Sequence, residues 1–127
     1  MRTAATRTVL ALAMLAGAFG PAIAAGPAKM METSVGKVYV DAKGMTLYTF
    51  DKDQKGVSNC YDQCAVNWPP FVAGAKAKAS GEWTLVDRKD GTKMWAYDGM
   101  PLYTFIKDKK PGDVVGDGVG GVWHVAK

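Results

Sequence analysis

Residues 44–53 read G-M-T-L-Y-T-F-D-K-D, and residues 99–108 read G-M-P-L-Y-T-F-I-K-D. Eight of the ten positions are identical, and the two copies are offset by 55 residues. A repeat that occurs twice is too short for a solenoid, which needs about three or more units to bury a continuous core. The sequence therefore predicts two copies of one supersecondary unit that face each other.

The residues inside each copy alternate as they do in a β-strand. Aromatic side chains two positions apart fall on one face of a pleated chain. Each run ends in Lys-Asp, and the aspartate is placed to cap backbone N–H groups of the following loop. Aromatic alternation of this kind is typical of a half-buried strand, so core and turn roles are the favoured interpretation. The residues of this repeat motif are Tyr48, Phe50, Asp53, Tyr103, Phe105 and Asp108.

Residues 1–24 have the pattern of a signal peptide. Arg2 and Arg7 precede an apolar stretch over residues 9–19, and Ala-Ile-Ala at residues 22–24 is a small-x-small cleavage site. The stretch is too short to span a bilayer. We expect an exported protein that begins near Ala25, without a membrane span, and we expect no lipid anchor because no Cys follows the cleavage site.

The remaining residues, 25–127, suit one domain with one modest core. Loss of the two arginines lowers the formal net charge from +4 to +2. That charge is not clustered, which argues against nucleic-acid binding. Two cysteines in an exported chain favour a disulfide.

Turn residues divide the mature chain into short strands. Residues 25–33 are small and polar, and we expect them to be frayed. A hairpin is predicted from strands over residues 37–41 and 45–50 around a turn at 42–44. A helix is predicted over residues 60–67, capped by Ser58 or Asn59 and ended by Trp-Pro-Pro. The second half predicts a three-strand meander over residues 82–87, 92–97 and 100–105, and a last strand over 122–125.

Three segments resemble a known bacterial family. They are L-Y-T-F-D-K-D, C-Y-D-Q-C-A-V-N-W-P-P, and the run from Y-D-G-M-P-L-Y-T-F to V-G-G-V-W-H-V. Together they are similar to the secreted repeat of unknown function, a family also described as lipoproteins with a Y-x-(F/W/Y)-x-x-D motif. The resemblance covers residues 36–125 and implies tandem repeats in an exported protein. It implies no reaction.

The cysteines and the soft ligands leave two interpretations open. Cys60 and Cys64 lie four apart with no following His, so they are not a haem attachment site. A structural disulfide is favoured, with a labile bridge or a metal pair as the alternatives. Met45 and Met100 are equivalent in the two copies, and with His124 they offer soft ligands for copper. Methionine in a small β-protein is more often core filler.

Catalysis is poorly supported by the residue types. The lone His124 has no nucleophile near it in sequence, and none of the three serines of the mature chain lies in a nucleophile-like context. Asp53 and Asp108 suggest an acid–base pair, but a shared turn role explains them without chemistry. We therefore expect no enzyme and no cofactor.

We predict a mainly β fold: a small antiparallel domain of two related hairpin repeats, about residues 36–75 and 82–126, with one short helix. The favoured function is an exported, non-catalytic binding or structural module that meets an unknown cell-envelope or extracellular partner, in the periplasm or outside the cell. The alternative is a periplasmic redox or metal-binding accessory protein. Loops that follow the two copies differ, and if they converge they bring together the candidate binding residues Tyr61, Trp68, Lys109 and Asp113.

Overall fold

The computed structural model describes residues 26–127, so the predicted signal peptide lies outside the described part. The fold is mainly β, as the sequence predicts, with antiparallel sheets and one small helix. In chain order the elements are β1 (Lys29–Thr33), β2 (Gly36–Val40), β3 (Tyr48–Phe50), α1 (Gln63–Asn67), β4 (Trp83–Asp87), β5 (Lys93–Tyr97), β6 (Met100–Pro101), the 3₁₀ turn η2 (Val119–Gly121) and β7 (Trp123–Val125).

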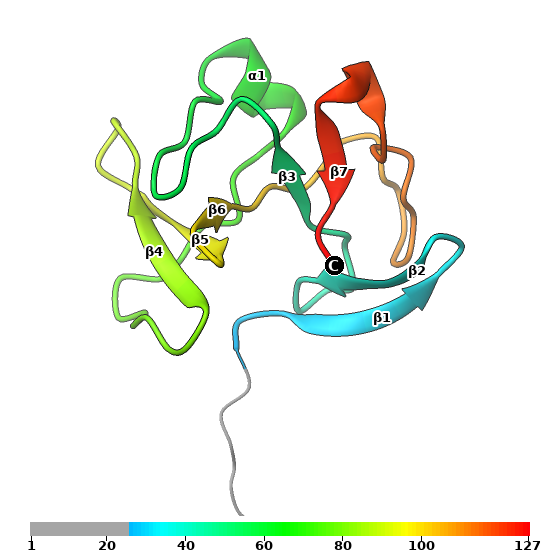
Figure 1. Ribbon diagram of the computed structural model, residues 1–127, viewed down its shortest axis with the longest axis horizontal. Helices are drawn as coiled ribbons and strands as arrows, with labels where there is room; N and C mark the ends of the chain where they lie inside the picture. Colours follow the sequence, from blue (N-terminus) through cyan, green and yellow to red (C-terminus); the bar gives the residue numbers. More distant parts are fainter. Residues whose placement is uncertain (1–25) are drawn as a thin grey trace, which may run out of the picture.

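The strands pair in three groups. β1 pairs with β2, β3 pairs with β7, and β4, β5 and β6 follow one another in a meander. Figure 1 shows β3 and β7 between two wings, one formed by β1 and β2 and the other by β4 and β5. Because β7 is the last strand, the chain closes on its own first half.

The two copies of the repeat meet at their tyrosines. The amide of Tyr48 donates to the carbonyl of Tyr103 at 2.8 Å, and the amide of Tyr103 donates to the carbonyl of Tyr48 at 3.0 Å. This antiparallel bridge is reciprocal. A reciprocal bridge between equivalent residues relates the two halves by an approximate two-fold axis.

The prediction that residues 25–33 are frayed is wrong. Lys29–Thr33 forms β1, which pairs with β2 from Lys29↔Val40 to Thr33↔Gly36. Its charged and polar residues hide the strand signal, because three of its five side chains are exposed and only Met31 and Thr33 are half-buried. The strand forms because it satisfies the backbone groups along one edge of β2.

The predicted first hairpin is correct at its turn and over residues 45–47, and it is wrong for residues 48–50. The amide of Asp41 donates to the carbonyl of Met45 at 2.9 Å. Gly44 takes a φ of 86°, the left-handed conformation that glycine adopts at little cost. Two further residues still pair with β2: Thr46 bridges Val40, and the amide of Leu47 donates to the carbonyl of Tyr39 at 2.9 Å. From Tyr48 onward the chain leaves β2, and Tyr48–Phe50 pairs with Trp123–Val125 instead. At residues 48–50, pairing with the far end of the chain replaces pairing with the neighbouring strand.

The predicted three-strand meander is confirmed. Trp83 lies opposite Tyr97, and Tyr97 lies opposite Met100 around a turn in which Asp98 and Gly99 both have positive φ. The last strand is shorter than predicted and ends at Pro101. Residues 102–106 stay extended against residues 67–71, where two prolines have no amide to donate to a regular ladder.

The helix starts three residues later than predicted. α1 runs from Gln63 to Asn67, and no side chain caps its first turn. Asp62 holds the N-cap position, so neither predicted cap, Ser58 nor Asn59, lies next to the first turn. The hydroxyl of Ser58 bonds that of Tyr103, and the amide of the Asn59 side chain donates to the Lys52 carbonyl.

The core lies on both sides of the tyrosine bridge. The smaller cluster consists of Leu47, Leu102 and Ala126, with Tyr39, Trp83 and Tyr97 packed against it. The larger cluster joins aromatic residues of both repeats to apolar residues of β2, β5 and β7. It contains Val38, Val40, Tyr48, Phe50, Cys60, Trp68, Val86, Met94, Ala96, Tyr103, Phe105, Trp123 and Val125.

Candidate functional site

The motif tyrosines and aspartates bond across the two halves. Both tyrosine side chains are fully buried, and each donates its hydroxyl proton to the aspartate of the other copy. Tyr48 reaches Oδ2 of Asp108 at 2.7 Å, and Tyr103 reaches Oδ2 of Asp53 at 2.6 Å. The two tyrosines therefore lie in matching, hydrogen-bonded environments. Each aspartate is engaged by a buried tyrosine of the other copy.

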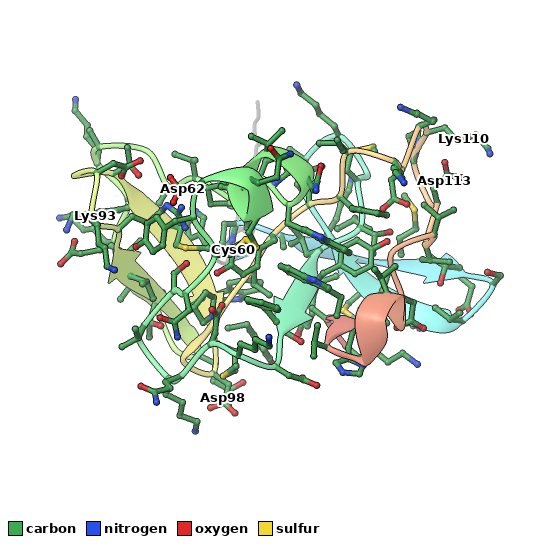
Figure 2. The ribbon with its side chains drawn as sticks, turned by 90° about the horizontal axis from the view of Figure 1, so that it is seen from above. Cys60, Asp62, Lys93, Asp98, Lys110 and Asp113 are labelled. Atoms are coloured by element: carbon green, nitrogen blue, oxygen red, sulfur yellow. A yellow bond between two sulfur atoms is a disulfide. The ribbon has the colours of Figure 1, made fainter. Side chains whose placement is uncertain are left out.

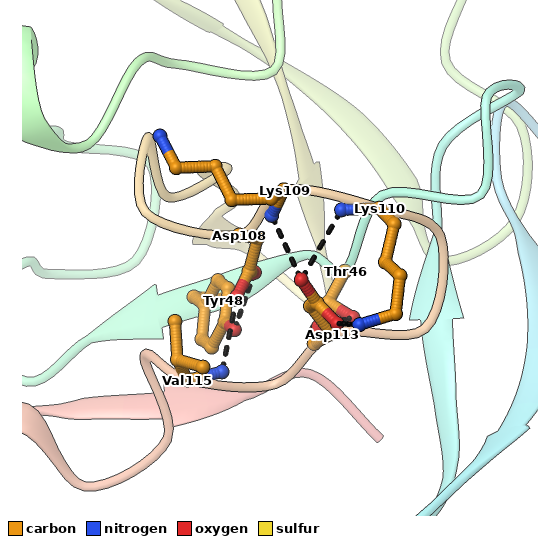
Figure 3. A network of polar contacts seen from close by, with 7 residues as sticks. All are labelled: Thr46, Tyr48, Asp108, Lys109, Lys110, Asp113 and Val115. Carbon is orange, nitrogen blue, oxygen red and sulfur yellow. Dashed lines mark hydrogen bonds and ion pairs between the residues drawn. The ribbon is translucent and has the colours of Figure 1, made fainter.

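The aspartates also cap the loops that follow them, as predicted. Oδ1 of Asp53 accepts the amide of Asn59 at 2.7 Å, and Oδ1 of Asp108 accepts the amide of Val115 at 3.0 Å. Figure 3 shows the second of these networks, in which Asp108 lies between the Tyr48 hydroxyl and the loop backbone. Each aspartate thereby ties one loop to the opposite strand.

One network contains a buried cation and the other does not. Arg88 is only 6% exposed, and its guanidinium donates to Ser58 Oγ at 2.9 Å and to the Cys60 carbonyl at 2.8 Å. Ser58 in turn bonds the Tyr103 hydroxyl at 2.6 Å. A chain of hydrogen bonds therefore runs from Arg88 through Ser58 and Tyr103 to Asp53.

Burial dominates the electrostatics of both networks. Desolvation raises the pKa of Asp53 and of Asp108 above the usual range, against the lowering effect of the hydrogen bonds from tyrosine. The charge of Arg88 also opposes the rise in the pKa of Asp53, whereas the charge of Asp113 adds to the rise in the pKa of Asp108. The pKa of each tyrosine is raised by burial and by its aspartate, so both keep their protons. Fully buried tyrosines bound in this way hold the two halves together.

Aromatic rings from both repeats stack in a column. Trp68 and Trp123, which are also 55 residues apart, stack with centroids 3.8 Å apart and planes 3° apart. Phe50 stacks on Trp123 at 4.2 Å, and Phe105 stacks on Trp68 at 3.9 Å. The approximate two-fold axis passes between the tryptophans. The predicted binding residue Trp68 is therefore 95% covered within this column.

The predicted disulfide is present. Cys60 and Cys64 are bonded, with Cα atoms 5.2 Å apart. Figure 2 shows Cys60 inside the molecule beneath α1. Tyr61, a predicted binding residue, contacts the second half instead. Its ring lies 4.2 Å from the Arg88 guanidinium, and its hydroxyl accepts the Lys89 amide at 3.1 Å.

The other two predicted binding residues organise a turn. One carboxylate oxygen of Asp113 accepts the amides of Lys109 and Lys110 at 2.8 and 3.1 Å. These hydrogen bonds lower the pKa of Asp113. Its backbone carbonyl accepts the Thr46 hydroxyl at 2.7 Å, which attaches the turn to the first repeat (Figure 3). Lys109 and Asp113 thus lie together. Tyr61 contacts Arg88 and Lys89 instead, and Trp68 stacks within the column.

The three predicted soft ligands lie in different settings. His124 faces solvent and bonds Asp51 at 2.9 Å. Met100 lines a shallow surface pocket with Leu102 and Ala126, and Met45 is half-buried beside the first turn. In residues 26–127, no three His, Cys, Asp or Glu side chains gather in a way that could hold a metal ion.

A pocket of about 430 Å³ lies between the two wings of the fold. Three half-buried aromatic residues line it: Tyr39 of β2, Trp83 of β4 and Tyr97 of β5. The Tyr39 ring lies 5.4 Å from Trp83 and 4.8 Å from Tyr97, and Trp83 lies 4.9 Å from Tyr97. Rings at this spacing touch one another, and the pocket opens beside them.

Polar groups complete this aromatic pocket. Ser80, Gly81 and Glu82 form its exposed rim. The pKa of Tyr97 is raised, first by the hydroxyl of Tyr39 and then by Glu82. Gly26 closes another side, where a Cβ atom would come within 2.3 Å of the Trp83 indole nitrogen.

The residues of the aromatic pocket were not among those predicted from the sequence. They come from strands of different sheets, and pairing periodicity does not say which strands meet. One signal was available, because Trp83 and Tyr97 fall outside the repeated decapeptide. Residues that the duplication does not account for are the ones that a specific task would explain.

A protein-family model described as "Secreted repeat of unknown function" matches the chain twice, at residues 29–72 and 84–127. The two matched segments contain both tyrosine–aspartate networks and the ring column. No curated protein matches, and no solved structure matches. Within residues 26–127, none of the helices has the length and apolar character needed to cross a membrane.

Proposed function

The chain belongs to the family of secreted repeats of unknown function, and we propose that it is an exported, non-catalytic binding module of the cell envelope. Its binding site is the aromatic pocket of Tyr39, Trp83 and Tyr97. The repeated motif supplies the scaffold, and the pocket between the two halves supplies the specific task.

The observation that carries this proposal is the convergence of three aromatic rings and a polar rim in one pocket. Ligand sites are concave, with aromatic walls and a few placed polar groups. The pocket has Tyr39, Trp83 and Tyr97 in its lining and Ser80 and Glu82 at its rim, so it offers a ligand both aromatic and polar contacts. Another pocket, about 350 Å³ in volume, is lined by small residues from Val72 to Ala75 and by Gly91 to Lys93, without an aromatic ring.

A non-catalytic role agrees with the placement of the titratable groups. The motif aspartates and tyrosines are bonded to each other in the core, and Tyr48 and Tyr103 have no exposed surface. The lining of the aromatic pocket holds one carboxylate, that of Glu82. General acid–base catalysis needs groups within hydrogen-bond reach of the substrate.

Nuclear magnetic resonance titration tests the proposal. Uniformly ¹⁵N-labelled protein is titrated with choline, glucosamine, N-acetylglucosamine, D-alanine, phosphate and acetate, which represent the chemistry of envelope components. We expect at least one compound to shift the indole Nε1–H of Trp83 together with the amides of Tyr39 and Tyr97. Saturable shifts that map elsewhere, or no shifts with any compound, contradict the proposal.

Two variants provide the matched comparison. Trp83→Ala removes one wall of the aromatic pocket and should abolish the shifts at Tyr39 and Tyr97. Val72→Ala truncates an exposed side chain of the small-residue pocket and should leave them unchanged. Melting temperatures of both variants verify that they fold. Equal loss of binding in both would contradict the assignment of the site.

A further inference from the structure

We infer that the ligand of the aromatic pocket is a small organic cation that carries an alkylammonium group. This inference rests on the proposed function and adds the chemical class of the ligand. It follows from three features of the pocket: the charge of its lining, its aromatic walls, and the place of its carboxylate.

The lining residues carry one charged side chain, and it is negative. Glu82 lies at the rim, and the lining contains no Lys, Arg or His, although the whole chain is basic with a formal net charge of +4. A carboxylate in a lining that holds no cationic side chain repels anions and attracts cations. Phosphate and carboxylate ligands are therefore disfavoured at this pocket.

The aromatic walls attract cations by a second mechanism. The faces of Trp and Tyr rings carry negative potential, and a cation within about 6 Å of a ring centroid is stabilised. The centroids of Tyr39, Trp83 and Tyr97 all lie within 5.4 Å of one another. One ammonium group on the open side of the cluster can therefore approach more than one ring.

The pocket lining also offers oxygen atoms to a bound cation. Tyr39 and Tyr97 carry hydroxyl groups and Glu82 carries a carboxylate, and all three residues line the pocket. An alkylammonium group placed there meets ring carbon atoms through its methyl or methylene groups and oxygen atoms through its charge. A neutral sugar would use the same rings and hydroxyls but would gain little from the charge of Glu82.

Isothermal titration calorimetry with choline and its neutral isostere 3,3-dimethylbutan-1-ol tests the inference. The two ligands share shape and hydroxyl group and differ in charge. We expect choline to bind with a dissociation constant of about 1 mM, as suits one ammonium group on a partly exposed surface. The neutral isostere should bind at least about fivefold more weakly than choline. A factor of five is the difference that a cation–π contact of about 1 kcal/mol makes.

Two carboxylate variants locate the charge effect. Glu82→Gln should weaken choline binding by about twofold to fivefold, as loss of a partly exposed ion pair does. Glu32→Gln removes the same charge from exposed β1 and should leave the affinity unchanged. Choline should also shift the Trp83 indole resonance.

The outcomes separate this inference from the proposed function. If the neutral isostere or glucose binds as tightly as choline at Trp83, the ligand class is wrong and the binding site stands. The same follows if Glu82→Gln and Glu32→Gln bind choline equally. If no compound perturbs Trp83, both the site and the ligand class are wrong.

Discussion

The loops that follow the two copies of the repeat solve the same structural problem in different ways. Each must return from a motif aspartate to a tryptophan of the column, over residues 53–68 in the first half and 108–123 in the second. The first loop uses the Cys60–Cys64 disulfide, the helix α1 and the buried Arg88. The second uses the Asp113 turn and glycines.

The comparison shows which parts of the duplicated unit cannot vary. The tyrosine–aspartate bonds, the capped loop amides and the stacked tryptophans are the same in both halves. The means of stabilising the loop between them is different. One pair of equivalent positions illustrates this. The residue that follows the capped amide is Cys60 in the first loop and Gly116 in the second.

The largest effect should come from the column, where the halves are alike. Trp68→Ala and Trp123→Ala should each lower the free energy of unfolding by about 3–5 kcal/mol, because truncation of a buried tryptophan leaves a large cavity. The two losses should agree within about 1 kcal/mol, since each ring stacks on one Phe and on the other Trp. Chemical denaturation measures both. A column variant with little cost in one half alone would break the equivalence of the halves.

The loops should fail by different mechanisms with effects of intermediate size. Replacing Cys60 and Cys64 by Ala should cost about 2 kcal/mol, because the disulfide closes a short loop, and the protein should still fold. Gly116→Ala should cost about 1–3 kcal/mol through overpacking, since its Cβ would lie 2.8 Å from Trp68 and 2.9 Å from Tyr48.

Reductant distinguishes these two loop variants. Dithiothreitol should lower the melting temperature of the Gly116→Ala protein and of the unmodified protein by similar amounts. It should leave the variant without cysteines unchanged. Insensitivity of the unmodified protein to reductant would show that the first loop is stabilised by its other contacts, among them the Arg88 bonds.

Much of this architecture was predictable from the decapeptide, because strand alternation and turn residues are local signals. The meander, the glycine turns and the core position of the tyrosines followed from them, and the disulfide followed from the presence of two cysteines in an exported chain. The partner of β3 did not, since its ladder joins Tyr48–Phe50 to Trp123–Val125 and only tertiary structure selects that pairing. β1 was missed because exposed Lys and Glu weaken its pattern.

The candidate site was less predictable than the fold. Tyr39, Trp83 and Tyr97 sit on strands whose alternation indicates a half-buried face, but it does not indicate that β2 meets β4 and β5. Lys109 and Asp113 belong to one turn, in which the Asp113 carboxylate accepts the Lys109 amide. Aspartate commonly has this role in loops. The charge of these two residues, and their place in a loop that differs between the two copies, suggested a binding role. The turn alone explains their hydrogen bonds.

A double-mutant cycle sharpens the comparison of the two hydrogen-bond networks. Tyr103→Phe and Arg88→Met should be coupled by about 0.5–3 kcal/mol, because Ser58 links the two side chains. Tyr48→Phe and Arg88→Met should be additive within about 0.5 kcal/mol, since the recorded hydrogen bonds of Tyr48 do not involve Arg88. Equal coupling in the two cycles would mean that Arg88 acts on both networks.

The smallest expected effect is on the pH dependence of stability. Burial raises the pKa of Asp108 in the folded protein above 3.8, its usual value, so the folded state holds this proton more tightly than the unfolded state does. The resulting stabilisation is full below the unfolded pKa and is lost as pH rises through the folded pKa. Between these two values, the free energy of unfolding should therefore fall less steeply with rising pH for Asp108→Asn than for the unmodified protein.

Carboxylates with lowered pKa, such as Asp113, give the opposite slope, so the difference between variant and unmodified protein is the quantity to measure. Urea unfolding at a series of pH values from 3 upward provides it. An identical slope in both proteins would contradict a raised pKa for Asp108.

The crossed tyrosine–aspartate bonds have a consequence for the origin of the fold. Half of this chain alone would hold one aspartate without its tyrosine and one tyrosine without its aspartate, both in apolar surroundings. A single unit would therefore need a second copy, and the approximate two-fold axis is the axis such a dimer would have. Joining the copies in one chain fixes their effective concentration, so that assembly no longer depends on how much protein a cell exports.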